Sequence, residues 1–205
     1  MGSKVHLGCG LHAVEGWVNI DRSPGIVLDR LPPIKIALRR IGVLSEAHMA
    51  TWPRSVIRRD VRKRLPFEDS SVAAIYSSHM LEHLPLTVAE GVLAECKRVL
   101  SEGGVIRLAL PDGLAIAREL VDARGSALAA RSYSEALCAT DSRSGWRRLI
   151  SSATHQWQPT SPLVIQLLFD AGFQDPIERA YHVGHLPDLE VIERRPESLF
   201  VEATG

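Results

Sequence analysis

The 205-residue sequence contains few cysteines, no long apolar run and no net charge, and each absence excludes a class of protein. The three cysteines, Cys9, Cys96 and Cys138, are widely separated, odd in number and without the spacing of a metal site. They argue against a disulfide framework and predict a reducing, cytoplasmic location. No apolar run approaches the roughly 20 residues of a membrane-spanning helix, and residues 1–4 do not resemble a secretory leader. We therefore expect a soluble protein.

Charge is balanced over the whole chain but not along it. Lys and Arg total 24, as do Asp and Glu, which argues against a dedicated nucleic-acid-binding protein. Residues 30–64, however, contain ten basic residues against two acidic ones. Within them, residues 30–44 predict a partly amphipathic helix with a basic face, which can cover a cleft or make peripheral contact with a membrane. The alternative is a solvated helix face packed on the core.

Predicted strands and helices alternate over most of the chain. We expect strands near residues 4–7, 17–20, 56–57, 72–78 and 105–110, and helices at 86–100, 112–124 and 162–171. This alternation is typical of a parallel sheet covered on both faces, with a ligand crevice at the carboxyl ends of its strands. The last two strands, 177–181 and 198–203, have no clear helix between them and are expected to pair antiparallel. Length and even composition favour a single domain spanning 1–205.

A Gly-x-Gly turn follows the first apolar run, at Gly8 and Gly10, and a second apolar run ends in Asp21. Because glycine has no Cβ, the backbone at such a turn can approach a ligand closely. An acidic side chain at the tip of the next strand can accept the hydroxyl protons of a ribose. The pattern predicts nucleotide binding, although the turn also occurs for its geometry alone. A full G-x-G-x-x-G is absent, which counts against an NAD(P)-dependent oxidoreductase, the alternative enzyme class.

Five motifs occur in order along the chain. They are VHLGCG at 5–10, GWVNID at 16–21, LPF at 65–67, SHMLEHL at 78–84, and ECKRVL at 95–100 with glycines at 103 and 104. Together they resemble class I S-adenosylmethionine-dependent methyltransferases of the type 11 kind. The resemblance implies an α/β, Rossmann-like, doubly wound fold with a seven-stranded, mostly parallel sheet whose last strand is antiparallel. A narrower similarity, to bacterial methyltransferases of glycan and natural-product pathways, rests on GWVNID and on the AGF at 171–173.

The resemblance also implies a cofactor site for S-adenosylmethionine. It assigns the methionine part to the first turn, the ribose to Asp21 and the adenine to Asp60. The full cofactor-binding set is Leu7, Gly8, Cys9, Gly10, Asp21, Arg22, Asp60, Val61 and Ser78. The family's third glycine is replaced here by Leu11 and His12, so we expect a looser turn with the backbone N–H groups of Cys9 and Gly10 available as donors. The alternatives are a turn-capping role for Asp21 and an arginine partner for Asp60.

Methyl transfer to a hydroxyl requires alignment of the acceptor with the methyl group and removal of the acceptor's proton. A histidine is the natural base for the second task. His79 directly follows a predicted strand, His83 lies four residues later, and His155 belongs to a later polar excursion. Asp112, at the tip of the next strand, can hold a substrate hydroxyl or orient an imidazole. The alternative for each histidine is a packing role.

His79, Glu82 and His83 also lie within one turn, at a spacing that can bind a divalent metal. We favour a site without metal, because Glu82 can instead point inward and pair with an arginine or cap backbone amides.

The leading interpretation is an enzyme that uses S-adenosylmethionine to methylate an oxygen of a sugar, glycan or other polyhydroxylated metabolite. The local basic charge suggests an anionic acceptor, and the inserted segments 30–54 and 123–160 are expected to form the substrate side or a lid. Nitrogen and carbon acceptors stay open. The alternatives are the oxidoreductase and a catalytically silent domain that binds a cofactor or a partner. The oligomeric state is not indicated by the sequence.

Overall fold

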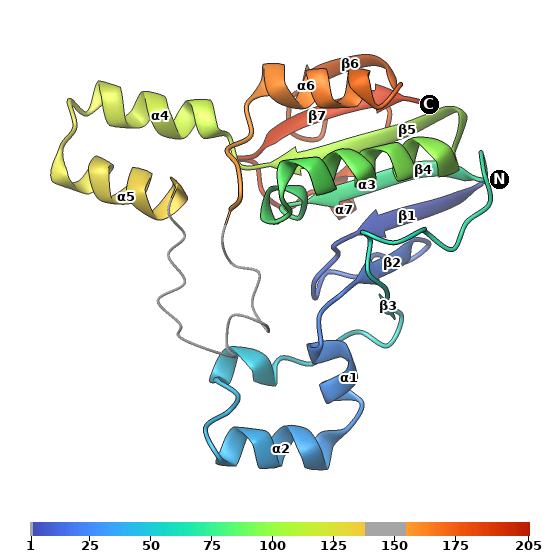
Figure 1. Ribbon diagram of the computed structural model, residues 1–205, viewed down its shortest axis with the longest axis vertical. Helices are drawn as coiled ribbons and strands as arrows, with labels where there is room; N and C mark the ends of the chain where they lie inside the picture. The colour runs from blue at the N-terminus through green and yellow to red at the C-terminus, as the bar shows by residue number, and fades with distance from the viewer. Residues whose placement is uncertain (1, 138–154) are drawn as a thin grey trace.

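The computed structural model describes residues 2–137 and 155–205, and seven strands in these residues form one sheet (Figure 1). The strands are β1 Ser3–Leu7, β2 Val18–Asp21, β3 Ile57–Arg58, β4 Val72–Ser78, β5 Leu100–Leu110, β6 Gln174–Arg179 and β7 Leu199–Thr204. Their order across the sheet is β3-β2-β1-β4-β5-β7-β6.

The pairing directions confirm the predicted topology. Strands β1 to β5 pair in parallel with their neighbours, whereas β7 lies antiparallel between β5 and β6. The chain runs outward from β1 to β3 on one side and then returns to β4 and β5 on the other. The switch in direction falls between β1 and β4, where the connections leave the strand ends towards opposite sides and open a crevice.

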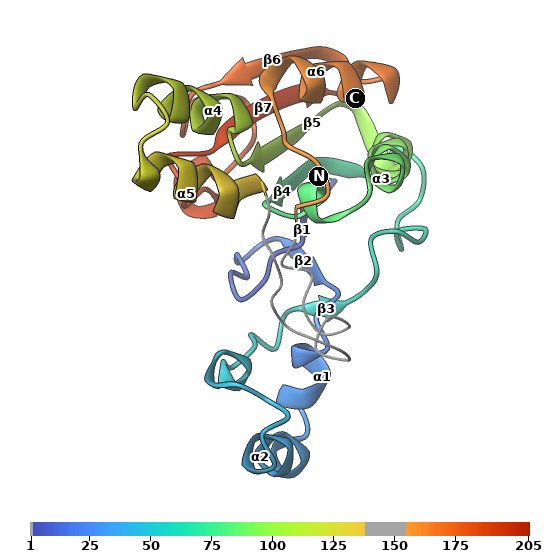
Figure 2. The ribbon, with the colours of Figure 1, turned by 60° about the vertical axis from the view of Figure 1, so that its left-hand side comes forward.

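The helices are distributed unevenly around the sheet. They are α1 Gly25–Asp29, α2 Pro32–Arg40, η1 Glu46–Met49, η2 Leu81–His83, α3 Leu86–Val99, α4 Gly113–Asp122, α5 Ala127–Leu137, α6 Ser161–Asp170 and α7 Leu189–Ile192. One face of the sheet is covered by α3 and α6, whose apolar residues join the main core (Figures 1 and 2). The opposite face is covered by the short α7 and neighbouring loops, which pack on Tyr76 and Phe200. Among the described residues, no helix is long and apolar enough to cross a bilayer.

Two helical excursions extend from the sheet. Helices α1 and α2 lie beyond the β3 edge, and the α4–α5 pair projects past the end of β5 (Figures 1 and 2). Helix α2 forms as predicted, but its buried residue is Lys35, whereas Ile34 and Ile36 are exposed. The Lys35 Nζ pairs with Asp29 at 2.7 Å and donates to the carbonyls that end η1. Helix α5 was not predicted, because its apolar spacing is interrupted by small and polar residues.

Two predicted boundaries differ from the structure. Helix α3 ends at Val99, and β5 begins at Leu100 rather than at residue 105. The glycines at 103 and 104 therefore lie inside a strand, where Gly103 adopts a φ of 69°. Strand β6 begins at Gln174, three residues before the predicted position. The residues missed at these two strand starts, 101–104 and 174–176, are polar, glycine or proline, which are typical of turns rather than strands.

A buried arginine ties the last third of the chain to the sheet. Arg107, on β5, is fully buried, and its Nε donates to Glu193 Oε1 at 2.5 Å. Its Nη1 donates to the carbonyl of Val183 at 2.8 Å and contacts Glu202 at 3.3 Å, and its Nη2 donates to the carbonyl of Ala180 at 2.8 Å. The guanidinium thus holds together β5, β7 and the excursion between β6 and β7.

Removing one partner from this buried network leaves a charge without compensation. We therefore expect Glu193→Ala to lower the free energy of unfolding by about 3–5 kcal/mol. The matched control is Glu46→Ala, which breaks the exposed pair between Arg39 and Glu46 and is expected to cost less than about 1 kcal/mol. Urea denaturation followed by circular dichroism measures both changes. Equal losses in the two variants would contradict the central role of the buried pair.

Candidate functional site

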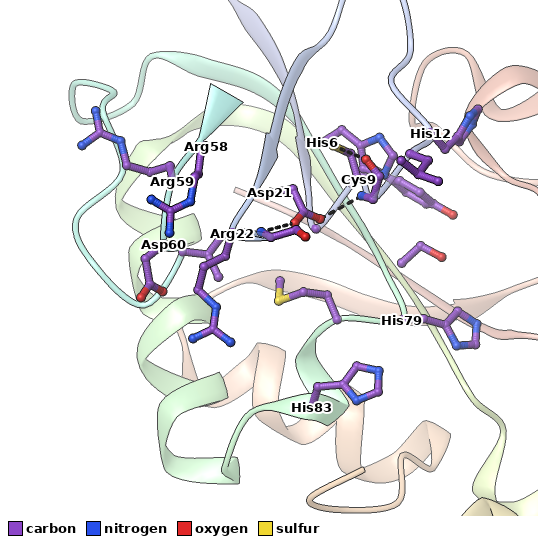
Figure 3. Close-up of a pocket in the computed structure, with 18 of the residues that line it drawn as sticks. His6, Cys9, His12, Asp21, Arg22, Arg58, Arg59, Asp60, His79 and His83 are labelled. Carbon is purple, nitrogen blue, oxygen red and sulfur yellow. Dashed lines mark hydrogen bonds between the residues drawn. The ribbon is translucent and has the colours of Figure 1, made fainter. Parts of the chain in front are cut away.

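A cleft of about 1140 Å³ opens at the carboxyl ends of β1, β2 and β4 (Figure 3). It is lined by the turn after β1, the residues that follow β2 and β3, and the segment from Ser78 to Leu84 after β4. Figure 3 shows Asp60 and His79 at opposite ends of this region with Asp21 between them. The volume lies just above the roughly 300–1,000 Å³ typical of small-molecule sites, so the cleft is large enough for a cofactor-sized ligand.

The glycine turn is shaped by two residues with positive φ, Gly8 at 67° and Gly10 at 56°. A Cβ at Gly8 would lie 2.6 Å from the Met80 side chain, so this position requires glycine. The expectation of available N–H donors in the turn is not met. The Cys9 amide donates to the carbonyl of Ile20, and the Gly10 amide donates to Asp21.

Asp21 joins two loops at the floor of the cleft. Its Oδ2 accepts from the Gly10 amide at 2.9 Å, and its Oδ1 accepts from the Ser23 amide at 2.7 Å (Figure 3). The carboxylate also lines the cleft. Asp21 therefore has the turn-capping role of the alternative, and each of its oxygens keeps a second lone pair for a ligand; its contact with a ribose stays a prediction.

Asp60 lines the cleft but is paired with an arginine. Arg62 donates from Nε to Oδ1 at 2.8 Å and from Nη2 to Oδ2 at 2.5 Å, and its backbone amide adds a third bond. These hydrogen bonds, assisted by the charges of Arg62 and Arg22 and opposed by burial, lower the pKa of Asp60 to about 2. The structure thus shows the alternative for Asp60, a pair with an arginine. Contact of Asp60 with adenine stays a prediction.

The other predicted cofactor residues divide into two groups. Arg22, Val61 and Ser78 line the cleft together with the glycine turn. Leu7 is buried in the core beneath the turn and does not line the cleft. Its contribution is to position the following glycines through β1.

His79 has an unusual backbone for a residue with a side chain. Its φ is 48°, and its amide donates to the carbonyl of Ala109 on β5. Its Nε2 lies 2.9 Å from Ser198 Oγ, and its Nδ1 lies 3.5 Å from Glu82 Oε1. Burial, followed by the charge of Arg195, lowers the pKa of His79 to about 4. A strained residue held by its surroundings at a cleft is a candidate for function.

The remaining predicted catalytic residues lie in different places. His83 lines the cleft, and its ring centroid is 5.0 Å from that of His155. His155 itself is not among the residues that line the cleft. Asp112 does not line the cleft either. Its Oδ1 caps α4 by accepting hydrogen bonds from the amides of Leu114 and Ala115.

Glu82 is the most deeply buried acidic side chain near the cleft, with 0% exposure. Neither carboxylate oxygen accepts a hydrogen bond from another described residue, so the expected pairing with an arginine or with backbone amides is not met. Burial raises the pKa of Glu82 to about 7, although its own amide and Arg195 act in the opposite direction.

Several cleft residues were not predicted from the sequence. Arg194 and Arg195, which follow α7, line the cleft beside Ile192. His6 also lines it, and burial lowers the pKa of His6 to about 3. The arginines belong to no recognised motif, and the local sequence does not show that the segment after α7 returns to the strand ends.

Comparison with known proteins supports the class of enzyme. A family model described as a methyltransferase domain matches residues 39–108, roughly a third of the chain. No curated protein matches. A SAM-dependent methyltransferase from Thermotoga maritima, described as a possible histamine N-methyltransferase, superposes with a TM-score of 0.53 at 16% identity, covering 100% of this chain and 82% of that one.

Two further solved structures share the fold. A SAM-dependent methyltransferase from Archaeoglobus fulgidus has a TM-score of 0.50 at 12% identity, covering 100% of this chain and 87% of that one. PigF with SAH has a TM-score of 0.50 at 12% identity, covering 99% of this chain and 50% of that one. These likenesses establish the fold, and with the family match they support a methyltransferase that uses S-adenosylmethionine rather than an oxidoreductase.

The pair between Asp60 and Arg62 predicts a specific titration. Because the pKa of Asp60 is lower in the folded protein than its ordinary value of 3.8, the pair stabilises the fold above about pH 4, and this stabilisation is lost as the pH falls towards 2. In carboxyl carbon NMR, we expect Asp60 to titrate near pH 2 and to return towards its ordinary value in Arg62→Ala. Arg39→Ala, outside the cleft, should leave the titration unchanged. An ordinary midpoint in the unsubstituted protein would contradict the pairing.

Proposed function

We propose that this protein transfers a methyl group from S-adenosylmethionine to a hydroxyl oxygen of an anionic, polyhydroxylated small molecule such as a phosphorylated or nucleotide-linked sugar. The observation that carries the proposal is the cleft at the switch point of the sheet, which contains the glycine turn, Asp21, Asp60 and His79. The methyltransferase-domain match over 39–108 supports the same class.

The residues present fit the cofactor. Glycine at position 8 keeps the turn close to Met80, while the space around Gly10 is open, because a Cβ added there would meet no atom within 4 Å. The proposal assigns the ribose hydroxyls to the Asp21 carboxylate and the adenine amino group to Asp60. Since Arg62 occupies both oxygens of Asp60, cofactor binding would have to share or displace that contact.

When bound, S-adenosylmethionine supplies a methyl group on a positively charged sulfur, which is already activated for displacement. The protein then has to align the acceptor oxygen, exclude water and take the hydroxyl proton. We assign the proton to His79, because it lines the cleft and its strained backbone is held in place by β5. Ser198 Oγ lies 2.9 Å from Nε2 and orients the imidazole, which leaves Nδ1, 3.5 Å from Glu82 Oε1, to take the proton.

The charge around the cleft supports an anionic acceptor. Seven basic residues line it, namely Arg22, Arg58, Arg59, Arg62, Lys63, Arg194 and Arg195. Two acidic residues, Asp21 and Asp60, line the same cleft, and both accept hydrogen bonds within the described structure. The excess of positive charge attracts a phosphate or carboxylate group. The segments 30–54 and 123–160 are proposed as walls or a lid around the cleft; none of their described residues is among those that line it, and residues 138–154 lie outside the described structure.

Isothermal calorimetry tests the cofactor. We expect S-adenosylmethionine to bind and NAD⁺ not to bind. Loss of the charged acceptor in Asp21→Ala should weaken binding about 10- to 100-fold, since a hydrogen bond to a charged group contributes about 1.5–3 kcal/mol. Asp170→Ala, at the exposed end of α6, is the matched control and should bind normally. Tighter binding of NAD⁺ would favour the oxidoreductase.

Methyl transfer tests the base. With labelled donor and matched phosphorylated and neutral glycosides, we expect turnover on the phosphorylated acceptor and a loss of about 10²- to 10⁴-fold in kcat for His79→Asn. Asparagine tolerates positive φ, so this variant should fold and keep its affinity for the donor. His48→Asn, outside the cleft, is the control. Full turnover by folded His79→Asn would refute the assignment, and donor binding without transfer to any acceptor would favour a catalytically silent domain.

A further inference from the structure

We infer a divalent-metal site formed by Glu82, His83 and His155. It lies beside the end of the cleft that contains His79, where the acceptor is proposed to bind. One candidate ligand atom from each residue lies within 4.8 Å of the other two. The sequence placed His79, Glu82 and His83 within one turn, but the structure adds His155 from a segment more than 70 residues away.

The Glu82 carboxylate is the reason for expecting an ion. The side chain is fully buried, and neither oxygen accepts a hydrogen bond from another described residue. Its Oε1 lies 3.5 Å from His79 Nδ1 and 4.0 Å from His83 Nε2. A buried carboxylate without hydrogen bonds is costly, and buried charges are normally paired or bound to a metal. A cation between Glu82 and the imidazoles would satisfy it.

The two segments that carry the cluster are fastened together. The Gln156 amide donates to the carbonyl of Glu82 at 2.7 Å, and the Trp157 Nε1 donates to the carbonyl of Leu81 at 3.3 Å. His155 is therefore held beside η2 by its own neighbours in the chain. The rings of His83 and His155 meet edge to face at 5.0 Å between centroids. The two segments are thus fastened by hydrogen bonds to backbone carbonyls that do not involve the proposed ligand atoms.

The donor set indicates the kind of ion. Two imidazole nitrogens and one carboxylate oxygen suit Zn²⁺ or a similar transition ion, whereas Mg²⁺ prefers oxygen ligands. In a tetrahedral site with ligands at about 2.0–2.1 Å, donor atoms lie roughly 3.3 Å apart, so the cluster would have to contract around the ion. Three protein ligands leave one position for another oxygen, and His83 itself lines the cleft (Figure 3).

The chemical role that we give to this metal site rests on the proposed function. An acceptor hydroxyl bound at the fourth position would have a lowered pKa. The hydroxyl proton would pass to His79, the oxygen would form a bond to the methyl carbon, and the carbon–sulfur bond would break with its electron pair going to sulfur. The products would be the methyl ether and S-adenosylhomocysteine, so atoms and charge balance.

Metal binding is tested on the full chain without a polyhistidine tag. After chelator treatment, we expect the protein to take up one Zn²⁺ per chain by native mass spectrometry and one Co²⁺ with the visible absorption of a four-coordinate site. Glu82→Gln, His83→Ala and His155→Ala should each weaken Co²⁺ binding at least about 10-fold. The matched controls are Glu90→Gln, on the exposed side of α3, and His185→Ala, an exposed residue beside Glu202 of β7; both should bind as the unsubstituted protein does.

The outcomes are separable. Absence of stoichiometric Zn²⁺ and Co²⁺ uptake by the unsubstituted protein overturns the inference, whatever the variants do. Equal uptake by the variants and the controls, or equal affinity for Mg²⁺, overturns it as well. Circular dichroism checks that each variant is folded. Calorimetry with S-adenosylmethionine on the metal-free protein tests the proposed function separately, since donor binding without metal uptake refutes the metal site alone.

Discussion

The position of β1 between β2 and β4 is the constraint on which the site depends. Because these strands are parallel, their carboxyl ends meet at one edge of the sheet. The chain leaves β1 and β4 towards opposite sides, so the backbone cannot close over the space between them. The Asp21 carboxylate then bonds the turn after β1 to the loop after β2 and sets the shape of the cleft floor. The glycine at position 8 lets this turn pass close to Met80.

The buried ion pair on the far side of the sheet contributes to the same cleft. Glu193 is held by Arg107 and is followed directly in the chain by Arg194 and Arg195, which line the cleft. The bond that holds Glu193 therefore also positions the backbone of Arg194 and Arg195. The excursion between β6 and β7 contains one short helix among its described residues, and it is also anchored by Asp188, which accepts hydrogen bonds from Lys4 and Trp17. The buried pair that stabilises the fold is thus linked to the positive charge of the cleft, because Glu193 and the two arginines are adjacent in the chain.

Two acidic groups, one that lines the cleft and one buried beside it, have contrasting surroundings. Asp60 lies under an arginine and has a low pKa, whereas Glu82 is buried without a hydrogen-bonded partner and has a raised one. The first group is therefore charged at neutral pH and bound to its own chain. The second is a carboxylate that gains most from a nearby cation or proton. This contrast separates the proposed adenine end of the cleft from the proposed acceptor end.

Local patterns in the sequence were sufficient for most of the sheet. Apolar runs that end at Gly8 and at Asp21 predicted β1 and β2, the run at 72–78 predicted β4, and the missing helix before the last strand predicted the antiparallel pairing of β6 and β7. The cleft-lining positions of Gly8, Asp21 and His79 followed, since each lies directly at a strand end. Helix α5 and the early start of β5 were not predicted, because the small and polar residues at 127–137 and the Ser-Glu-Gly-Gly at 101–104 are typical of loops.

The sequence by itself determined the alternation of strands and helices, the turn after β1 and the acidic residue after β2, because burial and backbone conformation at these positions depend on near neighbours. The tertiary structure alone decided that Arg62 pairs with Asp60. It also decided that Glu82 accepts no hydrogen bond from another described residue and that His155 lies beside Glu82. It also brought Arg194 and Arg195 to the strand ends. These outcomes depend on packing between distant segments and on which of many basic side chains reaches a given carboxylate. The sequence pattern does not give the distances between residues that are far apart in the chain.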